Sequence, residues 1–211
     1  MGEQMTLTRP TRTKPRLTVA VAELYPPRGQ WTESEFFMLS ERSNRLIELS
    51  DGDLEVLPLP TRRHQQILSR LLYLFFTYLE THAIGECLVA GIPVRLWPGK
   101  IREPDLVFML NEHFDRISDQ YWGPPDLAVE IHSPDTRKAD RRQKFQEYAE
   151  AGVAEYWMID PKAEGIEVHR LKGKDYELHG KFKAGDHVEP LALPGFVLSV
   201  DNVFKSVKPH A

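Results

Sequence analysis

The pattern of hydrophobic positions predicts one long helix in the first half of the chain and a series of short strands after it. From Thr61 to His82, apolar side chains recur every three or four positions, as on the buried face of an amphipathic helix. After Gly85 the pattern changes to short apolar runs separated by Gly and Pro, which is typical of strands. These predicted strands are residues 86–90, 92–97, 105–110 and 126–131.

Smaller elements are predicted on both sides of this region. Thr32 followed by Glu35 is a capping box that opens a short helix, and a turn at 50–52 joins two short apolar runs in a hairpin. A second helix is expected over about 138–151. Further strands are expected at 154–159, 166–171 and 176–178, with a last apolar piece at 198–204. This order of elements predicts an α/β fold that borders on α+β.

The chain length of 211 residues suits a single domain, because a chain of this size buries about 70% of the surface that it exposes when unfolded. Residues 1–30 contain four prolines and scattered basic residues with little periodicity, which predicts a flexible N-terminal arm. We expect residues 31–211 to form the domain.

Composition narrows the classes of protein that fit. The longest apolar run, 71–76, is far shorter than the roughly 20 residues of a membrane helix, and we recognise no export signal, so we expect no membrane partner and a cytoplasmic location. A single cysteine, Cys87, excludes an internal disulfide and a cysteine-based zinc site. The net charge of −4 does not attract nucleic acid, so a nucleic-acid site must come from local clusters of basic residues.

Two predicted strands carry a carboxylate that apolar packing does not explain. Asp105 opens one strand, and Glu130 lies inside the next, where it shares a face with Ala128 and His132. A buried carboxylate is costly unless it is paired or binds a metal, and two on consecutive strands can hold a hard cation such as Mg²⁺. From these residues alone, a structural explanation is equally good: Asp105 in a turn and Glu130 paired with an arginine.

A basic cluster follows the strand of Glu130. Five of the eight residues from 137 to 144 are Lys or Arg. Arg141, Lys144 and Tyr148 share a helical face, on which the lysine could reach a phosphate or an attacking water beside a metal. A solvent-exposed helix face is the alternative, because charge runs on helices are usually exposed.

Several of these residues occur in an order that resembles a known group of nucleases. Pro104-Asp105 and a strand ending in Glu130-Ile131-His132 resemble the acidic half of the PD-(D/E)xK signature of restriction-endonuclease-like enzymes. Similarity to the Uma-type endonuclease family extends through residues 47–53, His64, 127–137, 140–141, 144, 148–149 and 155–157, and covers roughly 31–204. The resemblance implies a restriction-endonuclease-like core, in which helices flank a central mixed sheet, with an added N-terminal hairpin and C-terminal strands.

The resemblance also implies a metal-dependent nuclease in which Asp105, Glu130 and Glu48 form an acidic cluster for Mg²⁺ or Mn²⁺. His132 stands two positions after the glutamate, where the signature has a lysine. Lys144 resembles the migrated lysine that this family places on the following helix. These three carboxylates and Lys144 are therefore the predicted catalytic residues.

His64 opens the long helix and is added to the predicted catalytic residues, although a cap or surface role is equally supported. Basic and imidazole side chains near the cluster are the predicted nucleic-acid contacts. They are Arg141, Arg137, His132 and Arg62.

We therefore predict a Mg²⁺-dependent endonuclease that hydrolyses phosphodiester bonds of DNA. The alternative, motivated by His132 in place of a lysine, is a nuclease fold that has lost catalysis and serves in nucleic-acid binding or dimerisation. The C-terminal strands exceed what a nuclease core needs, and their edges predict a homodimer. A monomer in light scattering would contradict the dimer.

Overall fold

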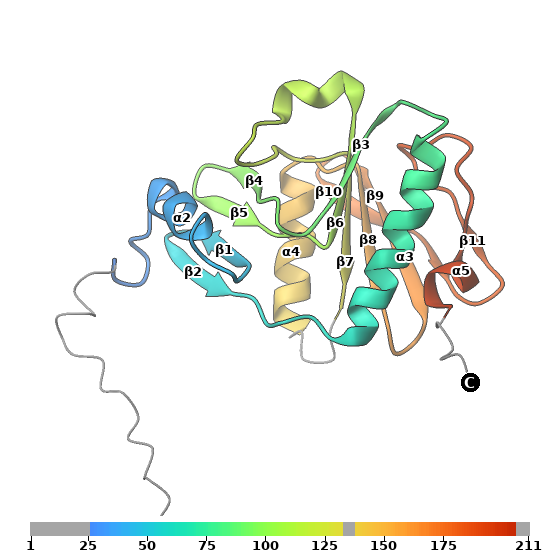
Figure 1. The fold of residues 1–211 in the computed structure, drawn as a ribbon, viewed down its shortest axis with the longest axis horizontal. Coiled ribbons are helices and arrows are strands. Elements are labelled where there is room, and N and C mark those ends of the chain that lie inside the picture. Colours follow the sequence, from blue (N-terminus) through green and yellow to red (C-terminus); the bar gives the residue numbers. More distant parts are fainter. Residues whose placement is uncertain (1–25, 133–137, 206–211) are drawn as a thin grey trace, which may run out of the picture.

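The structure is a computed structural model that describes residues 26–132 and 138–205 of the chain. Within these ranges the chain forms a six-stranded mixed sheet, a four-stranded sheet and a two-stranded sheet, with helices packed around them (Figure 1). The elements are α2 (Glu33–Ser40), β1 (Ile47–Ser50), β2 (Asp53–Val56), α3 (Arg62–Leu79), β3 (Gly85–Val89), β4 (Val94–Trp97), β5 (Lys100–Arg102), β6 (Leu106–Leu110), the 3-10 helix η1 (Asn111–Arg116), β7 (Leu127–Ile131), α4 (Lys138–Glu150), β8 (Glu155–Asp160), β9 (Gly165–Lys172), β10 (Asp175–Phe182), β11 (His187–Val188), β12 (Leu198–Ser199) and α5 (Val200–Phe204).

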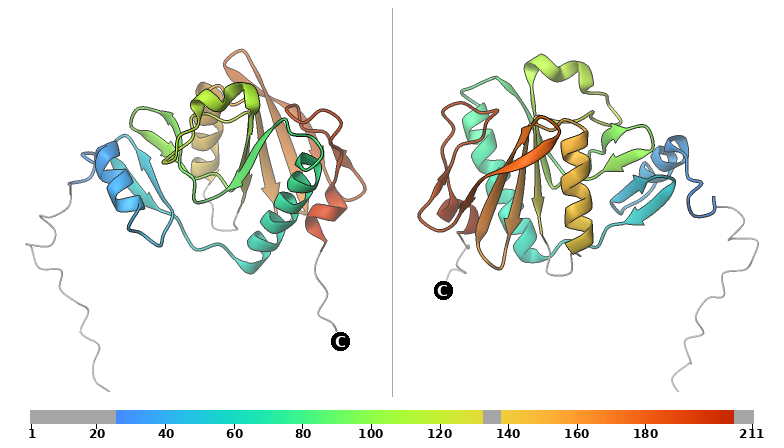
Figure 2. Two further views of the ribbon diagram at one scale, coloured as in Figure 1. Left: turned by 45° about the horizontal axis from the view of Figure 1, so that its top comes forward. Right: turned by 180° about the vertical axis from the view of Figure 1, so that it is seen from behind.

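The six-stranded sheet has the order β10-β9-β8-β7-β6-β3. Its neighbours pair antiparallel except β7 and β8, which are parallel. Parallel neighbours need a crossover connection, and α4 supplies it. The views from two sides show α3 on one face of this sheet and α4 on the other (Figure 2).

β7 lies in the middle of this sheet and is buried on both faces. Leu127 and Val129 belong to the apolar cluster that includes Leu71 of α3, whereas Ala128 packs in the cluster of Tyr148 on α4. The alternation predicted for this strand is confirmed, and it places Glu130 on the α4 face.

The four-stranded sheet, with the order β2-β1-β5-β4, packs one face against α2. Phe36 of α2, Leu49 of β1 and Ile101 of β5 share a small apolar cluster. Because side chains alternate, the neighbouring positions of β1 and β5 face the other way, toward α4. Those positions are polar, and they form one wall of the site described below. They are Glu48, Ser50, Lys100 and Arg102.

The predicted fold class is confirmed: a mixed sheet is flanked by helices, with a hairpin before it and further strands after it. The capping box of Thr32 and Glu35 opens α2 as expected. β5 was not predicted, because a strand of three residues is too short to show a period. The predicted arm over 1–30 falls mainly on residues outside the described ranges. Among the described helices, none combines the length and apolar character that crossing a bilayer requires.

The hairpin turn depends on Gly52, whose φ is +83° and whose added Cβ would lie 2.4 Å from the carbonyl oxygen of Gly29. We expect Gly52→Ala to lower the free energy of unfolding by about 2 kcal/mol or more, because it adds a backbone clash to the strain of a positive φ. Urea unfolding followed by circular dichroism measures this change. Gly99→Ala is the matched control, because Gly99 has the same φ and open space around it. Equal losses in the two variants would contradict the clash.

Candidate active site

The structure brings the two predicted strand carboxylates together. Asp105 directly precedes β6, and Glu130 lies in β7. The register pairs Leu106 with Val129, which places Asp105 opposite Glu130 at the next position. The backbone N–H of Ile131 donates to Oδ2 of Asp105 at 2.7 Å. The two carboxyl groups therefore lie side by side at the ends of neighbouring strands, with Glu130 directed toward α4 and Asp105 in contact with α3.

Glu130 is held by two residues of α4. The ammonium group of Lys144 lies 3.3 Å from Oε1 of Glu130, and the hydroxyl of Tyr148 donates to the same oxygen at 2.9 Å. Burial raises the pKa of Glu130 to about 7, and the nearby charge of Asp105 acts in the same direction, while Lys144 opposes both. Glu130 therefore gives up its proton less readily than an ordinary glutamate.

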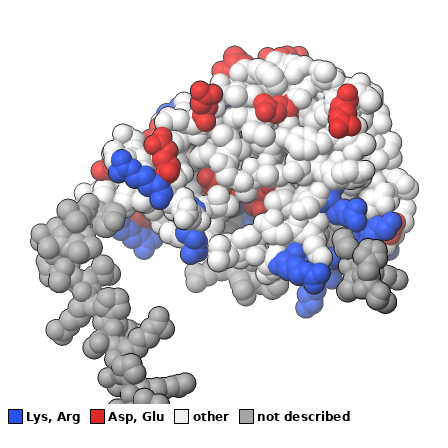
Figure 3. Space-filling model, in the orientation of Figure 1, with Lys and Arg blue, Asp and Glu red and all other residues white. Residues whose placement is uncertain are grey.

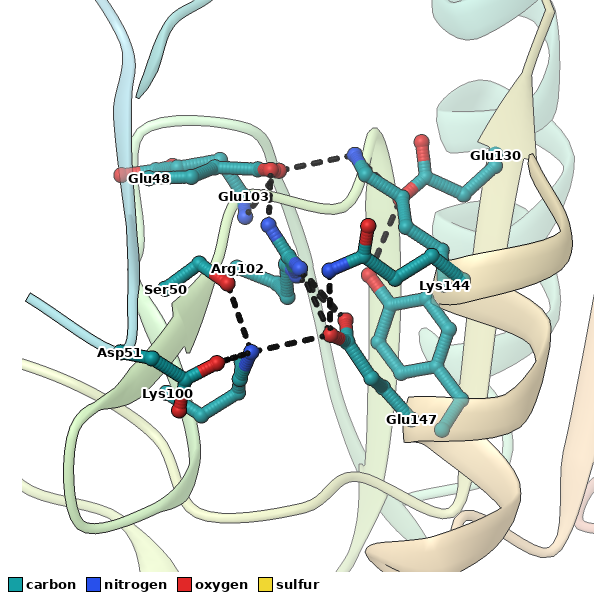
Figure 4. A network of polar contacts seen from close by, with 11 residues as sticks. Glu48, Ser50, Asp51, Lys100, Arg102, Glu103, Glu130, Lys144 and Glu147 are labelled. Atoms are coloured by element: carbon teal, nitrogen blue, oxygen red, sulfur yellow. Dashed lines mark hydrogen bonds and ion pairs between the residues drawn. The ribbon is translucent and has the colours of Figure 1, made fainter. Parts of the chain in front are cut away.

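Lys144 also bridges to Glu48 on the opposite wall. Its Nζ lies 2.8 Å from Oε1 of Glu48, and Arg102 of β5 donates to Oε2 of Glu48 at 2.8 Å (Figure 4). Glu48 is fully buried. Burial alone would raise its pKa, but Lys144 and Arg102 outweigh that effect and hold the pKa below its usual value. Glu48 is thus an ionised carboxylate between two cations.

The network continues away from Glu130 through Arg102. Its guanidinium donates from Nε and Nη2 to the two oxygens of Glu147 on α4, at 2.7 and 2.8 Å. Lys100 then joins Glu147, at 3.1 Å, to Asp51 in the hairpin turn, at 2.7 Å. Paired charges therefore fasten the four-stranded sheet to α4 (Figure 4).

His64 reaches the same cluster from the first turn of α3. Its Nε2 lies 2.9 Å from Oδ1 of Asp105, and both side chains are largely buried. Thr61 caps this helix, because its hydroxyl accepts the N–H of His64. Nδ1 of His64 is buried and has no hydrogen-bond partner among the described residues. Ile131 and His64 together contact both carboxylate oxygens of Asp105.

His132 lies just after β7, and its N–H donates to the carbonyl of Ile159. Burial lowers the pKa of its imidazole to about 4, and the charge of Arg141 acts in the same direction. The imidazole is therefore neutral at pH 7. His132 does not supply the permanent positive charge of the lysine that the signature places at this position.

Two of the predicted nucleic-acid contacts lie near the starts of the helices that carry His64 and Lys144. Arg62 is exposed at the start of α3, and Arg141 is half-buried near the start of α4. Arg137 falls outside the described residues. On the face shown in Figure 3, acidic side chains gather toward the top, and Lys and Arg lie along the lower edge, where α3 begins in Figure 1.

The carboxylate oxygens of this cluster supply part of the ligand shell that a divalent cation needs. Within residues 26–132 and 138–205, no group of three His, Cys, Asp or Glu side chains converges in a form that could hold a metal ion. Mg²⁺, however, commonly takes only one or two carboxylates from a protein and completes its shell with water and phosphate. Asp105 and Glu130 fit that requirement, because they are hard oxygen donors that lie side by side on neighbouring segments.

Sequence reasoning missed several members of this network. Arg102, Glu147 and Lys100 were assigned no role, and Tyr148 was noted only for sharing a helical face with Lys144. One signal was available: the alternating Lys100-Ile101-Arg102 segment just before Pro104-Asp105 puts two cations on the face opposite an apolar residue. Their partners on α4 lie at least 45 positions away and show no pattern.

Comparison with known proteins identifies the group to which this chain is related. A crystal structure of a putative nuclease from Anabaena variabilis has a similar fold, with a TM-score of 0.68, 20% identity, and coverage of 82% of this chain and 97% of that one. An uncharacterized protein of Synechocystis is 24% identical over 185 residues, which are 86% of this chain and 95% of the relative. Residues 33–201 match the Uma2 family, described as "Putative restriction endonuclease". The chain therefore belongs to the Uma2 family.

Proposed function

We propose that this protein is a divalent-metal-dependent endonuclease that hydrolyses phosphodiester bonds of DNA. The observation that carries the proposal is the pairing of Asp105 and Glu130 on neighbouring strands, with the ammonium group of Lys144 3.3 Å from Glu130. Two neighbouring carboxylates with a lysine beside them are groups that metal-assisted phosphoryl hydrolysis uses. Membership of the Uma2 family supports a nuclease.

Asp105 and Glu130 are the residues that would hold Mg²⁺ or Mn²⁺. When bound, such an ion supplies charge that polarises a phosphate oxygen and lowers the pKa of a bound water. Ligation needs ionised carboxylates, and Glu130 has a pKa of about 7 before any ion binds. His64 holds Asp105 in place from α3.

We assign Lys144 to stabilising the negative charge of the reacting phosphate. Its ammonium group lies beside the carboxylate pair, where a positive charge stabilises the negative charge that develops on phosphate oxygens. Glu48 accepts from Lys144, and both of its oxygens also contact Arg102 or the N–H of Glu103. We therefore assign Glu48 to orienting Lys144, in preference to the metal ligation that the resemblance implies.

His132 is neutral at pH 7 and half-buried, so we assign it to contact with the substrate or an ordered water, where a neutral imidazole accepts a hydrogen bond. Arg141 and Arg62, near the starts of α4 and α3, provide contacts to the DNA backbone. The overall charge of −4 means that such local contacts, and not the field of the whole molecule, attract DNA.

Cleavage of supercoiled plasmid and of single-stranded DNA, with Mg²⁺, Mn²⁺ or a chelator, tests the proposal. We expect metal-dependent cleavage by the natural protein and at least about a hundredfold loss in Asp105→Asn, because the amide is a poor ligand for a hard cation. Calorimetric titration with Mn²⁺ should show weakened metal binding in the same variant.

Asp115→Asn is the control, because Asp115 is exposed in η1, away from the cluster. Metal-independent cleavage, or equal rates in Asp105→Asn and the natural protein, would contradict the proposal. Binding to DNA without cleavage under any metal would favour the alternative of a catalytically inactive binding module.

A further inference from the structure

A polar cleft lies beside the lysine-bearing site and has no role in the chemistry described so far. Its volume is about 660 Å³, and it lies between the four-stranded sheet and α4, with the segment before α2 at its edge. Arg102, Glu55 and Asp53 line the sheet side, Gln143 lines the helix side, and Trp31 and Arg28 line the edge. This volume is several times that of a nucleobase.

The cleft is joined to the candidate active site through shared residues. Arg102 lines the cleft and also donates to Glu48, which holds Lys144. Glu55 pairs with Glu48 across β1 and β2, so both side chains share the sheet face toward α4. Gln143 directly precedes Lys144 on α4. A nucleotide next to a phosphate at Lys144 therefore lies within reach of this cleft.

The charges of the cleft do not suit a phosphate. Arg102 is already bound by Glu48 and Glu147, and Arg28 is bound by Asp53 at 2.9 Å. Glu55 is exposed and adds a negative charge. A phosphate entering here would meet carboxylates whose charge opposes its own and cations that are already paired.

The same lining suits a neutral, planar ring. Trp31 provides an aromatic side chain on which a base can stack. Gln143 provides an amide, whose nitrogen also donates to Glu147 at 2.9 Å, and Glu55 provides a carboxylate. These groups can contact the donors and acceptors on the edge of a base. Carboxylate oxygens accept from exocyclic amino groups, which adenine and cytosine carry and thymine lacks.

We propose that this cleft binds one unpaired or extruded nucleobase of the strand whose phosphate lies at Lys144, with Trp31 stacking on the ring and Gln143 and Glu55 contacting its edge. The proposal rests on the proposed nuclease function and adds a base-binding subsite to it. The subsite favours a base with an exocyclic amino group.

Equilibrium binding in the presence of a chelator tests the subsite without requiring cleavage. The full-length protein is titrated against labelled 12-residue single strands of dA, dC or dT, and against an abasic strand of the same length, by fluorescence anisotropy. We expect the dA and dC strands to bind about tenfold more tightly than the abasic strand. The affinity for the dT strand should be lower than for dA and dC but higher than for the abasic strand.

Gln146→Ala is the control for Gln143→Ala, because both replace an exposed glutamine of α4 and alanine favours the helix. Gln143→Ala also removes the hydrogen bond to Glu147. We expect Gln143→Ala and Trp31→Ala to reduce the preference for base-bearing strands several-fold, whereas Gln146→Ala and Trp31→Phe keep it. Glu55→Gln should remove the preference of dA and dC over dT. Thermal melts show which variants are folded.

Equal affinity of the natural protein for base-bearing and abasic strands would overturn the subsite, as would equal effects of Gln143→Ala and Gln146→Ala. The two proposals fail in different ways. Metal-dependent cleavage without base-dependent binding rejects the subsite and leaves the nuclease. Base-dependent binding that Gln143→Ala abolishes, in a protein that cleaves nothing, supports the subsite and rejects the nuclease.

Discussion

Lys144→Ala is expected to slow metal-dependent cleavage on the order of 10²- to 10³-fold while metal binding persists. The ammonium group lies 3.3 Å from Glu130 and 2.8 Å from Glu48, so its removal takes the positive charge away from the place where phosphate charge develops. Single-turnover cleavage rates measure the loss, and calorimetric titration with Mn²⁺ is expected to show that the variant still binds the ion.

The loss should fall on the rate of the bound complex more than on DNA affinity, because one cation contributes little to backbone binding but acts directly on the charge that forms in the transition state. Arg142→Ala is the control, because it removes an exposed cation from the same helix two positions away. Similar cleavage rates in the two variants would show that Lys144 has no special place in the chemistry.

Lys144→Ala also leaves the buried carboxylates of Glu48 and Glu130 without the cation between them, so we expect the variant to be less stable than the natural protein. Combining Lys144→Ala with Glu48→Gln removes that repulsion without restoring the cation. We expect the double variant to recover much of the thermal stability and none of the activity, which separates the role of Lys144 in folding from its role in cleavage.

Arg102→Met is expected to lower the free energy of unfolding by about 3–5 kcal/mol at pH 7, because removing one partner of a buried ion pair leaves uncompensated charge. Arg102 is 2% exposed and makes side-chain contacts to both Glu48 and Glu147. Arg95→Met is the comparison, because its pair with Glu33 is about one-quarter to one-third exposed. We expect about 1 kcal/mol or less there.

The pH dependence of this difference follows from Glu48. Its pKa in the folded protein lies below the ordinary value of 4.5, so its ionised form stabilises the fold above that pH and the contribution is lost as the pH falls through the folded pKa. Urea unfolding should therefore show the largest gap between the natural protein and Arg102→Met near pH 7, with a smaller gap below pH 4.5. A gap that widens toward acid would contradict the assignment.

Local patterns in the sequence predicted much of the fold. The three-to-four-residue period of α3, the turn at Gly52 and the alternation in β7 each depend on side chains within a few positions of one another. The same alternation placed Glu130 on one face with Ala128, and the structure has it there. Uma2-family membership had also been predicted from ordered motifs, and the family match confirms it.

Such local patterns do not predict which residues of the candidate site pair with one another. Lys144 contacts Glu48 across 96 positions, and Arg102 contacts Glu147 across 45. These contacts exist because the four-stranded sheet docks on α4, and no periodicity within either segment specifies which of several charged side chains becomes buried and paired. The sequence by itself determined the helices, most strands and the face of the sheet on which Glu130 lies. Only the tertiary structure decided which cation pairs with which carboxylate, because these ion pairs depend on distances between segments that are remote along the chain.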